Sequence, residues 1–244
     1  MKNTLLLLLV LLGLLTACED KYKDPDPKLM GYEYFPLEVG SYRIYNVTDI
    51  RFKSDVGDTT RFQMRERVDT TFTDQTGALN YKIIRSIRAN ENSAWEDDSV
   101  MTAVRSVNNL ILMQNNTKYV KMVFPVKEGK HWIGDAYNDR VASDYAVNER
   151  DGKELYTYRN VGENYYLNGN TFPNTVEIIQ GDYTSDDFVV DKRKEVYAEE
   201  IGRIYRQFTK IIFSPCSPQD CKYGEDYKIY GHERHEELIA HGKE

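Results

Sequence analysis

The feature that most constrains the fold of this chain is an alternation of apolar and polar residues at a period of two over residues 61–73. A strand with one buried and one solvated face requires this period, because successive side chains of a strand point to opposite faces. We therefore predict a half-buried β-strand in this segment. The side chains expected on its buried face are Phe62, Met64, Val68, Thr70 and Phe72.

A second run of the same kind follows a turn. Residues Asp74-Gln75-Thr76-Gly77 favour a turn, and the alternation resumes over residues 79–87, which predicts a β-hairpin. Short helices are expected at most over residues 185–199 and in the last dozen residues. Other strands are expected over residues 41–50, 100–107, 110–114, 118–123, 175–183, 204–213 and 227–232, with turns at Asn108-Asn109, Asn115-Asn116, Gly152 and Asn168-Gly169-Asn170.

The composition agrees with a sheet. The chain has 19 tyrosines, 9 phenylalanines and 2 tryptophans, and aromatic residues are enriched in strands. We predict an all-β, mainly antiparallel fold in which a meandering sheet forms a barrel or a sandwich, with few short helices. The formal net charge of −7 argues against binding to nucleic acid, so no such partner is expected.

The N-terminus has the features of a secretory signal. Lys2 supplies a positive charge, residues 5–15 are apolar apart from Gly13, and small residues precede Cys18. A helix of this apolar run spans only about 16 Å, roughly half of a bilayer core, so the run is too short for a permanent transmembrane helix. We predict a signal peptide over residues 1–17 that is removed from the mature protein.

The stretch Leu14-Leu15-Thr16-Ala17-Cys18 resembles the lipobox of bacterial lipoproteins. This resemblance implies a diacylglycerol and usually a further acyl chain, such as palmitate, on Cys18, which becomes the first residue of the mature chain. Residues 18–34 are charged and contain two prolines, which predicts a flexible tether. The pair Glu19-Asp20 is similar to the surface-export signals of Bacteroidota lipoproteins. We therefore expect an outer-membrane lipoprotein, with either a surface or a periplasmic orientation.

A motif of the order Phe, Pro, aliphatic, two variable residues, Gly and then an aromatic occurs twice, starting at Phe35 and at Phe124. Each copy is expected to open a strand: the proline ends what precedes it, and the glycine permits a turn. Residues 35–244 are predicted to form a single β-rich domain, with two similar halves near 35 and 124 as an open possibility. The first copy resembles the start of uncharacterised Bacteroidota lipoproteins, which brings no known activity.

Two further cysteines, Cys216 and Cys221, flank a short segment in a proline-containing loop. In an oxidising compartment this pair favours a disulfide, and the alternative is a metal half-site that also uses His232 and His235. These histidines belong to a His-Glu-x-His pattern, one residue short of the zinc-protease motif. On a helix they would share a face, with His241 nearby, but solvated histidines are the favoured interpretation. No metal or other cofactor is predicted.

Two functions remain open on the sequence alone. The first is a non-enzymatic envelope lipoprotein, held at the membrane by its lipid, that binds a hydrophobic ligand, a glycan or a protein partner. Its candidate ligand contacts are Trp95, Tyr137, Tyr165 and Tyr166. The second is a hydrolase that cleaves glycans with paired carboxylates. The candidate carboxylates for such chemistry, or for calcium, are Glu96, Asp97, Asp98, Asp182, Asp186 and Asp187.

Overall fold

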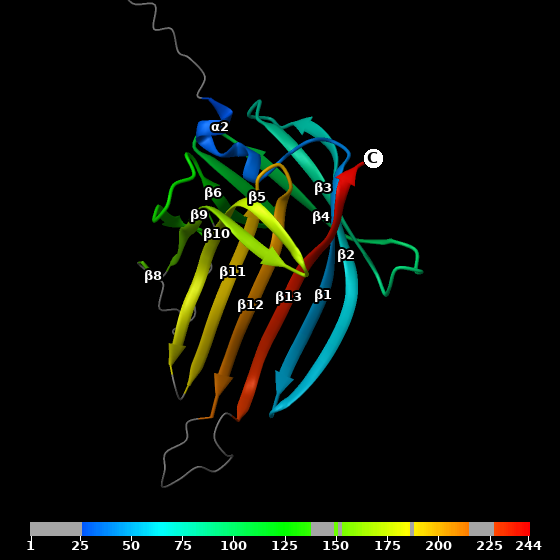
Figure 1. The fold of residues 1–244 in the computed structure, drawn as a ribbon, viewed down its shortest axis with the longest axis vertical. Coiled ribbons are helices and arrows are strands. Elements are labelled where there is room, and N and C mark those ends of the chain that lie inside the picture. Colours follow the sequence, from blue (N-terminus) through cyan, green and yellow to red (C-terminus); the bar gives the residue numbers. More distant parts are fainter. Residues whose placement is uncertain (1–25, 138–148, 151–152, 186–187, 215–226) are drawn as a thin grey trace, which may run out of the picture.

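One antiparallel sheet of 13 strands makes up most of the computed structural model and curls into a nearly closed barrel (Figure 1). The structure describes residues 26–137, 149–150, 153–185, 188–214 and 227–244. Along the sheet the strand order is β6-β5-β4-β3-β2-β1-β13-β12-β11-β10-β9-β7, and β8 pairs with β9 outside this path. The predicted all-β, mainly antiparallel fold is therefore confirmed, and of the two predicted forms, barrel or sandwich, it is the barrel.

The strands on the first side of the barrel follow one another in an up-and-down meander. Their bounds are β1 Ser41–Lys53, β2 Val56–Thr73, β3 Leu79–Arg88, β4 Glu96–Arg105, β5 Asn109–Gln114 and β6 Thr117–Val123. The bounds on the other side are β7 His131–Ile133, β8 Glu149–Arg150, β9 Lys153–Leu167, β10 Asn170–Ser185, β11 Val189–Ala198, β12 Gly202–Phe213 and β13 Lys228–Lys243. Strand β1 pairs with β13, so the first and last strands of the described part are neighbours.

The barrel closes where β6 approaches β7. The backbone N–H of Val120 donates to the carbonyl of Gly134 at 2.8 Å, and the indole Nε1 of Trp132 donates to the carbonyl of Val120 at 2.7 Å. Trp132 is buried and packs on the rings of Tyr156 and Tyr158 from β9. The closure therefore depends on one buried aromatic side chain as well as on backbone pairing.

The apolar core fills the end of the barrel beside the N-terminal helices, α2 (Pro27–Met30) and the 3-10 helix η1 (Tyr32–Tyr34). Met30, Tyr32 and Tyr34 pack against it, so the last part of the predicted tether is folded onto the barrel rather than extended. Residues 1–25 lie outside the described part, and no helix in the described part is long and apolar enough to cross a membrane. The core consists of Phe35, Leu37, Val68, Ile83, Met101, Ala103, Leu110, Leu112, Val120, Met122, Phe124, Trp132, Tyr156, Tyr158, Val176, Ile178 and Tyr197.

The predicted hairpin forms between β2 and β3. Asp74 accepts hydrogen bonds from the backbone of Thr76 and Ala78, and Gly77 has a φ of +83°, which a glycine adopts without strain. The prediction for the buried face of β2 holds up to Val68, since Met64 and Val68 are fully buried. It is wrong for Thr70 and Phe72, which are exposed, because the β2–β3 register shifts between Val68 and Thr70. Strand β2 is longer than predicted, because it begins at Val56.

Both helices suggested by the sequence are wrong. Residues 185–199 contain the end of β10 and all of β11, and the last dozen residues belong to β13. The sequence does not predict these strands because charged residues occupy positions on their inner faces, as Asp191 and Glu195 do in β11. The hydrophobic alternation that indicates a strand is therefore absent. Strand β9 was also missed, although its Tyr156 and Tyr158 point into the core.

The two Phe-Pro motifs adopt similar local structures. Phe35 and Phe124 both enter the apolar core, Gly40 and Gly129 both have positive φ, and a strand begins within two residues of each glycine. This agrees with a strand-opening role for the motif. A duplication of two halves remains a prediction.

Candidate binding site in the barrel lumen

Beyond the apolar core, and beside a second buried apolar cluster that includes Tyr45, Met64 and Ile204, the barrel interior holds paired charges. At its centre the carboxylate of Glu236 is fully buried and contacts three arginines: Arg203 Nη2 at 2.7 Å, Arg206 Nη1 at 2.9 Å and Arg234 Nε at 2.7 Å. Burial by itself would raise the pKa of Glu236, but these guanidinium groups outweigh it and hold the pKa well below its usual range. Glu236 therefore stays ionised in the protein interior.

A second buried carboxylate, Glu195, lies on the neighbouring wall. Lys121 Nζ donates to both of its oxygens at 2.7 and 2.9 Å, and the hydroxyl of Tyr197 donates to Oε2 at 2.7 Å. Burial opposes ionisation here too, yet Lys121, Arg203 and Arg206 lower the pKa of Glu195 to about 2. A lysine on β6 is thus joined to a glutamate on β11, 74 positions later in the chain.

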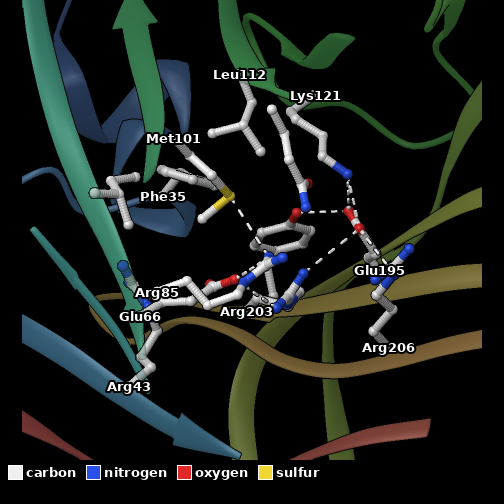
Figure 2. Close-up of a pocket in the computed structure, with 13 residues that line it drawn as sticks. Phe35, Arg43, Glu66, Arg85, Met101, Leu112, Lys121, Glu195, Arg203 and Arg206 are labelled. Carbon is white, nitrogen blue, oxygen red and sulfur yellow. Dashed lines mark hydrogen bonds and ion pairs between the residues drawn. The ribbon is translucent and has the colours of Figure 1, made fainter. Parts of the chain in front are cut away.

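Glu66 on β2 joins this network to the opposite wall. Its Oε1 accepts hydrogen bonds from Arg85 Nη2 at 2.7 Å and from Arg203 Nη2 at 3.1 Å (Figure 2). Arg203 therefore links Glu66 to Glu236, and the charged side chains form one connected cluster. A network of this kind is stable when its members satisfy one another, because an unpaired charge in a low dielectric is costly.

Two open pockets adjoin the charged cluster, and both are lined by basic residues. The first lumen pocket, of about 380 Å³, has four basic residues (Lys121, Arg193, Arg206 and Lys210) and one acidic residue, Glu154, in its lining. The second, of about 560 Å³, has four arginines (Arg51, Arg85, Arg206 and Arg234), a histidine and one acidic residue, Asp98. The carboxylates that pair with these cations, such as Glu195 and Glu236, are almost completely buried behind them. The cations are therefore the charges that a ligand in these pockets meets first.

Arg206 is shared by both pockets and has hydrogen-bonding capacity to spare. Within the described residues its guanidinium donates one hydrogen bond, to Glu236, and lies 3.7 Å from Glu195. A guanidinium carries five N–H donors, so most of them are available to a ligand. The two carboxylates raise the pKa of Arg206 against the effect of burial, which keeps it charged.

Gln180 supplies a second group without a partner in the first lumen pocket. It is only 7% exposed, and its Nε2 makes no hydrogen bond within the described residues. The β10–β11 register shifts between Ile179 and Gly181, so Gln180 is the extra residue of a β-bulge. Bulges re-aim side chains and are enriched beside active sites. The amide of Gln180 is therefore a buried donor beside the pocket that has no partner among the described residues.

Gly181 makes room for the charged wall beside Gln180. A Cβ atom at this position would lie 2.5 Å from Asp191 Oδ1 and 3.0 Å from Arg193 Nε. Those two residues form a double hydrogen bond, at 2.6 and 3.0 Å, and Arg193 also donates to Glu154 at 2.8 Å. Gln180 thus forms the bulge beside the pocket, and Gly181 allows Asp191 and Arg193 to approach the backbone of β10 closely.

The four aromatic residues predicted as ligand contacts do not meet in one place. Trp95 lies on the outer face of the barrel, with the guanidinium groups of Arg65 and Arg88 at 5.0 and 4.2 Å from its ring. Tyr165 is half-buried against Tyr205, with ring centres 6.0 Å apart. Tyr166 is 71% exposed and Tyr137 is 57% exposed, and neither lines one of the pockets described above. These four side chains therefore do not form one site, and their role as ligand contacts stays a prediction.

The histidines of the His-Glu-x-His pattern are separated by the strand that carries them. Within β13, His232 faces the lumen and contacts Asp49 Oδ2 at 2.9 Å, whereas His235 faces outward and contacts the hydroxyl of Tyr205 at 3.0 Å. Residues three apart in a strand point to opposite faces, so the shared helical face does not exist. The described residues contain no cluster of three possible metal ligands. Cys18, Cys216 and Cys221 lie outside the described residues, so lipidation and the disulfide stay predictions.

The predicted carboxylate pairs are also dispersed. Asp98 lines the second lumen pocket, Asp97 accepts a hydrogen bond from Ser86, and Asp182 forms an ion pair with Lys192 on the outer face of β10 and β11. Asp186 and Asp187 lie outside the described residues. The lumen carboxylates with a displaced pKa are all shifted downward, whereas a glycosidase acid needs a raised pKa. Asp135 and Glu33 do have raised pKa values, but neither lines a lumen pocket.

The paired carboxylates predict acid sensitivity. Glu195 has a pKa of about 2 in the folded protein against an ordinary value of 4.5, so its ionisation stabilises the fold above pH 4.5 and this contribution disappears as the pH falls towards 2. The loss amounts to about 3 kcal/mol for this residue. Urea unfolding at successive pH values should show nearly constant stability above pH 5 and a steep fall below it. Stability that stays constant down to pH 3 would contradict this, and Glu195→Gln should flatten the slope.

Comparison with known proteins gives no family assignment. No family model matches the chain, and no curated protein matches it. Among solved structures, it shows likeness to a "putative exported protein" of Bacteroides fragilis described as having a YmcC-like fold, at 12% identity and a TM-score of 0.37, over 86% of this chain and 98% of that one. A "putative lipoprotein" of Parabacteroides distasonis gives 12% identity and a TM-score of 0.36, over 84% of this chain and 98% of that one.

Proposed function

We propose that this protein is an envelope lipoprotein whose barrel binds a small anionic ligand in its lumen without chemically changing it. The observation that carries the proposal is the lining of the two lumen pockets, in which basic residues outnumber acidic ones four to one in each. A pocket with convergent polar groups is the usual form of a small-molecule site. Carboxylate or phosphate groups match the planar donors of the arginines.

The polarity of the lumen supports an anionic ligand rather than a hydrophobic one among the ligand classes predicted from the sequence. The apolar end of the barrel is filled by its own side chains, whereas the open volume is bordered by arginines, lysines and amides. A hydrophobic ligand would leave these polar groups without partners, at a cost of about 1–3 kcal/mol for each buried one. An anionic molecule, such as an acidic sugar or a dicarboxylate, would satisfy them. The rings of Tyr119, Tyr156 and Phe208 in the first lumen pocket provide surfaces for its carbon skeleton.

The membrane part of the proposal depends on the N-terminal sequence. Cleavage before Cys18 and acylation of its thiol would anchor the protein durably, because two or three chains bind far more firmly than one. We propose an outer-membrane location, with the orientation of the anchor left to experiment. Metabolic labelling with a palmitate analogue should mark the wild-type protein and not Cys18→Ala. Persistent labelling and membrane association of the variant would refute the anchor.

Ligand binding is tested with defined anions and a matched variant. We expect glucuronate, succinate or inorganic phosphate to raise the Tm, whereas glucose has no effect. Gln180→Leu should weaken the binding of the responding anion about tenfold, since one amide hydrogen bond is lost, while leaving stability unchanged or slightly higher, because the unpartnered donor is removed. Isothermal titration calorimetry measures both proteins.

Gln207→Leu is the control for this substitution, because Gln207 lies on the same sheet, within β12, and makes its hydrogen bond to Thr209 away from both pockets. Its affinity should match that of the wild type. Equal binding of glucose and glucuronate, or full affinity in Gln180→Leu, would overturn the proposed site.

A further inference from the structure

A small cavity of about 40 Å³ lies deeper in the barrel than the lumen pockets, where the apolar core meets the charged cluster. Figure 2 shows Phe35, Met101 and Leu112 on its apolar side and the arginines and glutamates on the other. The volume is enough for two or three water molecules or for one halide ion. It is too small for the organic anions proposed for the lumen pockets.

The charges around this cavity do not balance. Two carboxylates, Glu66 and Glu195, line it, and a third, Glu236, pairs with two of the lining arginines from behind. On the far side of Glu236, Arg234 Nη1 forms an ion pair with Asp49 Oδ2 at 3.1 Å, so these two residues add no net charge. The cavity therefore has a local excess of two positive charges. The basic residues that line it are Arg43, Arg85, Lys121, Arg203 and Arg206.

Two of these arginines also hold donors that have no acceptor. Arg85 is 8% exposed and Arg203 is 9% exposed, and the Nε of each is buried without a hydrogen-bond partner within the described residues. Their guanidinium groups lie close together, because both donate to the same oxygen of Glu66. An unmade hydrogen bond of a buried charged group is unfavourable, and it occurs here twice beside one cavity.

We propose that this cavity is a halide site, which chloride occupies through the guanidinium groups of Arg85 and Arg203. Water molecules could accept the two N–H bonds but would leave the excess charge uncompensated. A halide accepts hydrogen bonds from several directions and neutralises one of the two surplus charges. The cavity is distinct from the lumen pockets in size, but it shares Arg85 with the second of them and Arg206 with both, so the position of the halide itself must be observed.

Chloride-specific stabilisation tests this proposal. The Tm is measured in sodium chloride and in sodium gluconate at equal ionic strength, for the wild type and for Gln180→Leu, which should weaken any gluconate bound in the first lumen pocket. The Tm should rise saturably with chloride in both proteins, by about 3–6 °C when chloride exceeds its Kd tenfold. Arg85→Met should abolish the rise, while Arg88→Met, which removes an arginine from the outer face beside Trp95, should retain it.

A crystal of the wild-type protein soaked in sodium bromide shows the position of the halide directly. This test does not require any variant to fold. An anomalous peak in the cavity, within hydrogen-bonding distance of Arg85 Nε and Arg203 Nε, is the expected result. Equal Tm values in the two salts, or a cavity that contains only water after the soak, would overturn the halide site. Either outcome would leave the test of the lumen ligand unaffected, since that test uses Gln180 and organic anions.

Discussion

Replacing Glu236 by alanine is expected to lower the free energy of unfolding by about 3–5 kcal/mol, the usual cost of removing one partner from a buried ion pair. The carboxylate is fully buried and contacts Arg203, Arg206 and Arg234 within 2.9 Å, so its loss leaves three guanidinium groups short of negative charge in the interior. A typical domain has only 5–15 kcal/mol of stability, so the urea midpoint should fall sharply.

Two companion variants make this result interpretable. Glu236→Gln keeps the volume and an acceptor oxygen but loses the charge, and we expect a smaller decrease than for alanine. Glu233→Ala changes the outward face of the same strand, where no ion pair involves the side chain among the described residues, and should alter stability by less than about 0.5 kcal/mol. An equal effect of Glu233→Ala and Glu236→Ala would show that the buried network is not what matters.

Trp132→Ala should destabilise the barrel by a similar amount, about 3–5 kcal/mol, because it creates a large cavity. Trp132 is 8% exposed, packs against Tyr156 and Tyr158 with ring centres 6.0 and 4.5 Å away, and donates to the carbonyl of Val120 across the closure. Its loss removes side-chain packing where β6 and β7 meet. Trp132→Phe should cost less, since it keeps most of the ring packing and loses the hydrogen bond.

The other tryptophan is the matched control for this experiment. Trp95 lies on the outer surface against two arginines, so Trp95→Ala should cost only about 0.5–1 kcal/mol. Far-UV circular dichroism during urea unfolding measures all three variants without relying on the substituted fluorophores. If Trp95→Ala were as destabilising as Trp132→Ala, the closure of the barrel would not depend on the buried indole in the way described.

Strands with an apolar inner face were predictable, and strands with a charged inner face were not. Residues 61–73 alternate clearly because most of their inward positions are apolar, and they lie in β2. In β11, both Asp191 and Glu195 on the inner face and Lys192 and Lys194 between them are charged, so no hydrophobic period remains. Because hydrophobic alternation is the main signal for a strand, the sequence of this segment does not predict one.

The candidate site could not be predicted from the sequence either, because its residues are charged. Charged side chains are usually solvated, so nothing local marks Lys121, Arg203 or Glu236 as buried. Their burial is permitted only by partners far away in the chain, such as Glu195 for Lys121. The Gln180-Gly181 pair within a strand was the one local hint, since a glycine there suggests a bulge or a close approach.

The sequence by itself determined the all-β class, the central hairpin and its turn, and the expectation of a lipid anchor at Cys18, because each depends on residues that are close together in the chain. Only the tertiary structure decided that β1 pairs with β13, that Trp132 closes the barrel, and which charges face the lumen. The Trp132 hydrogen bond spans 12 positions, but the β1–β13 pairing and the charged lumen join residues about 70 to 200 positions apart. The favourable pairing of buried opposite charges there depends on the whole sheet having curled around them.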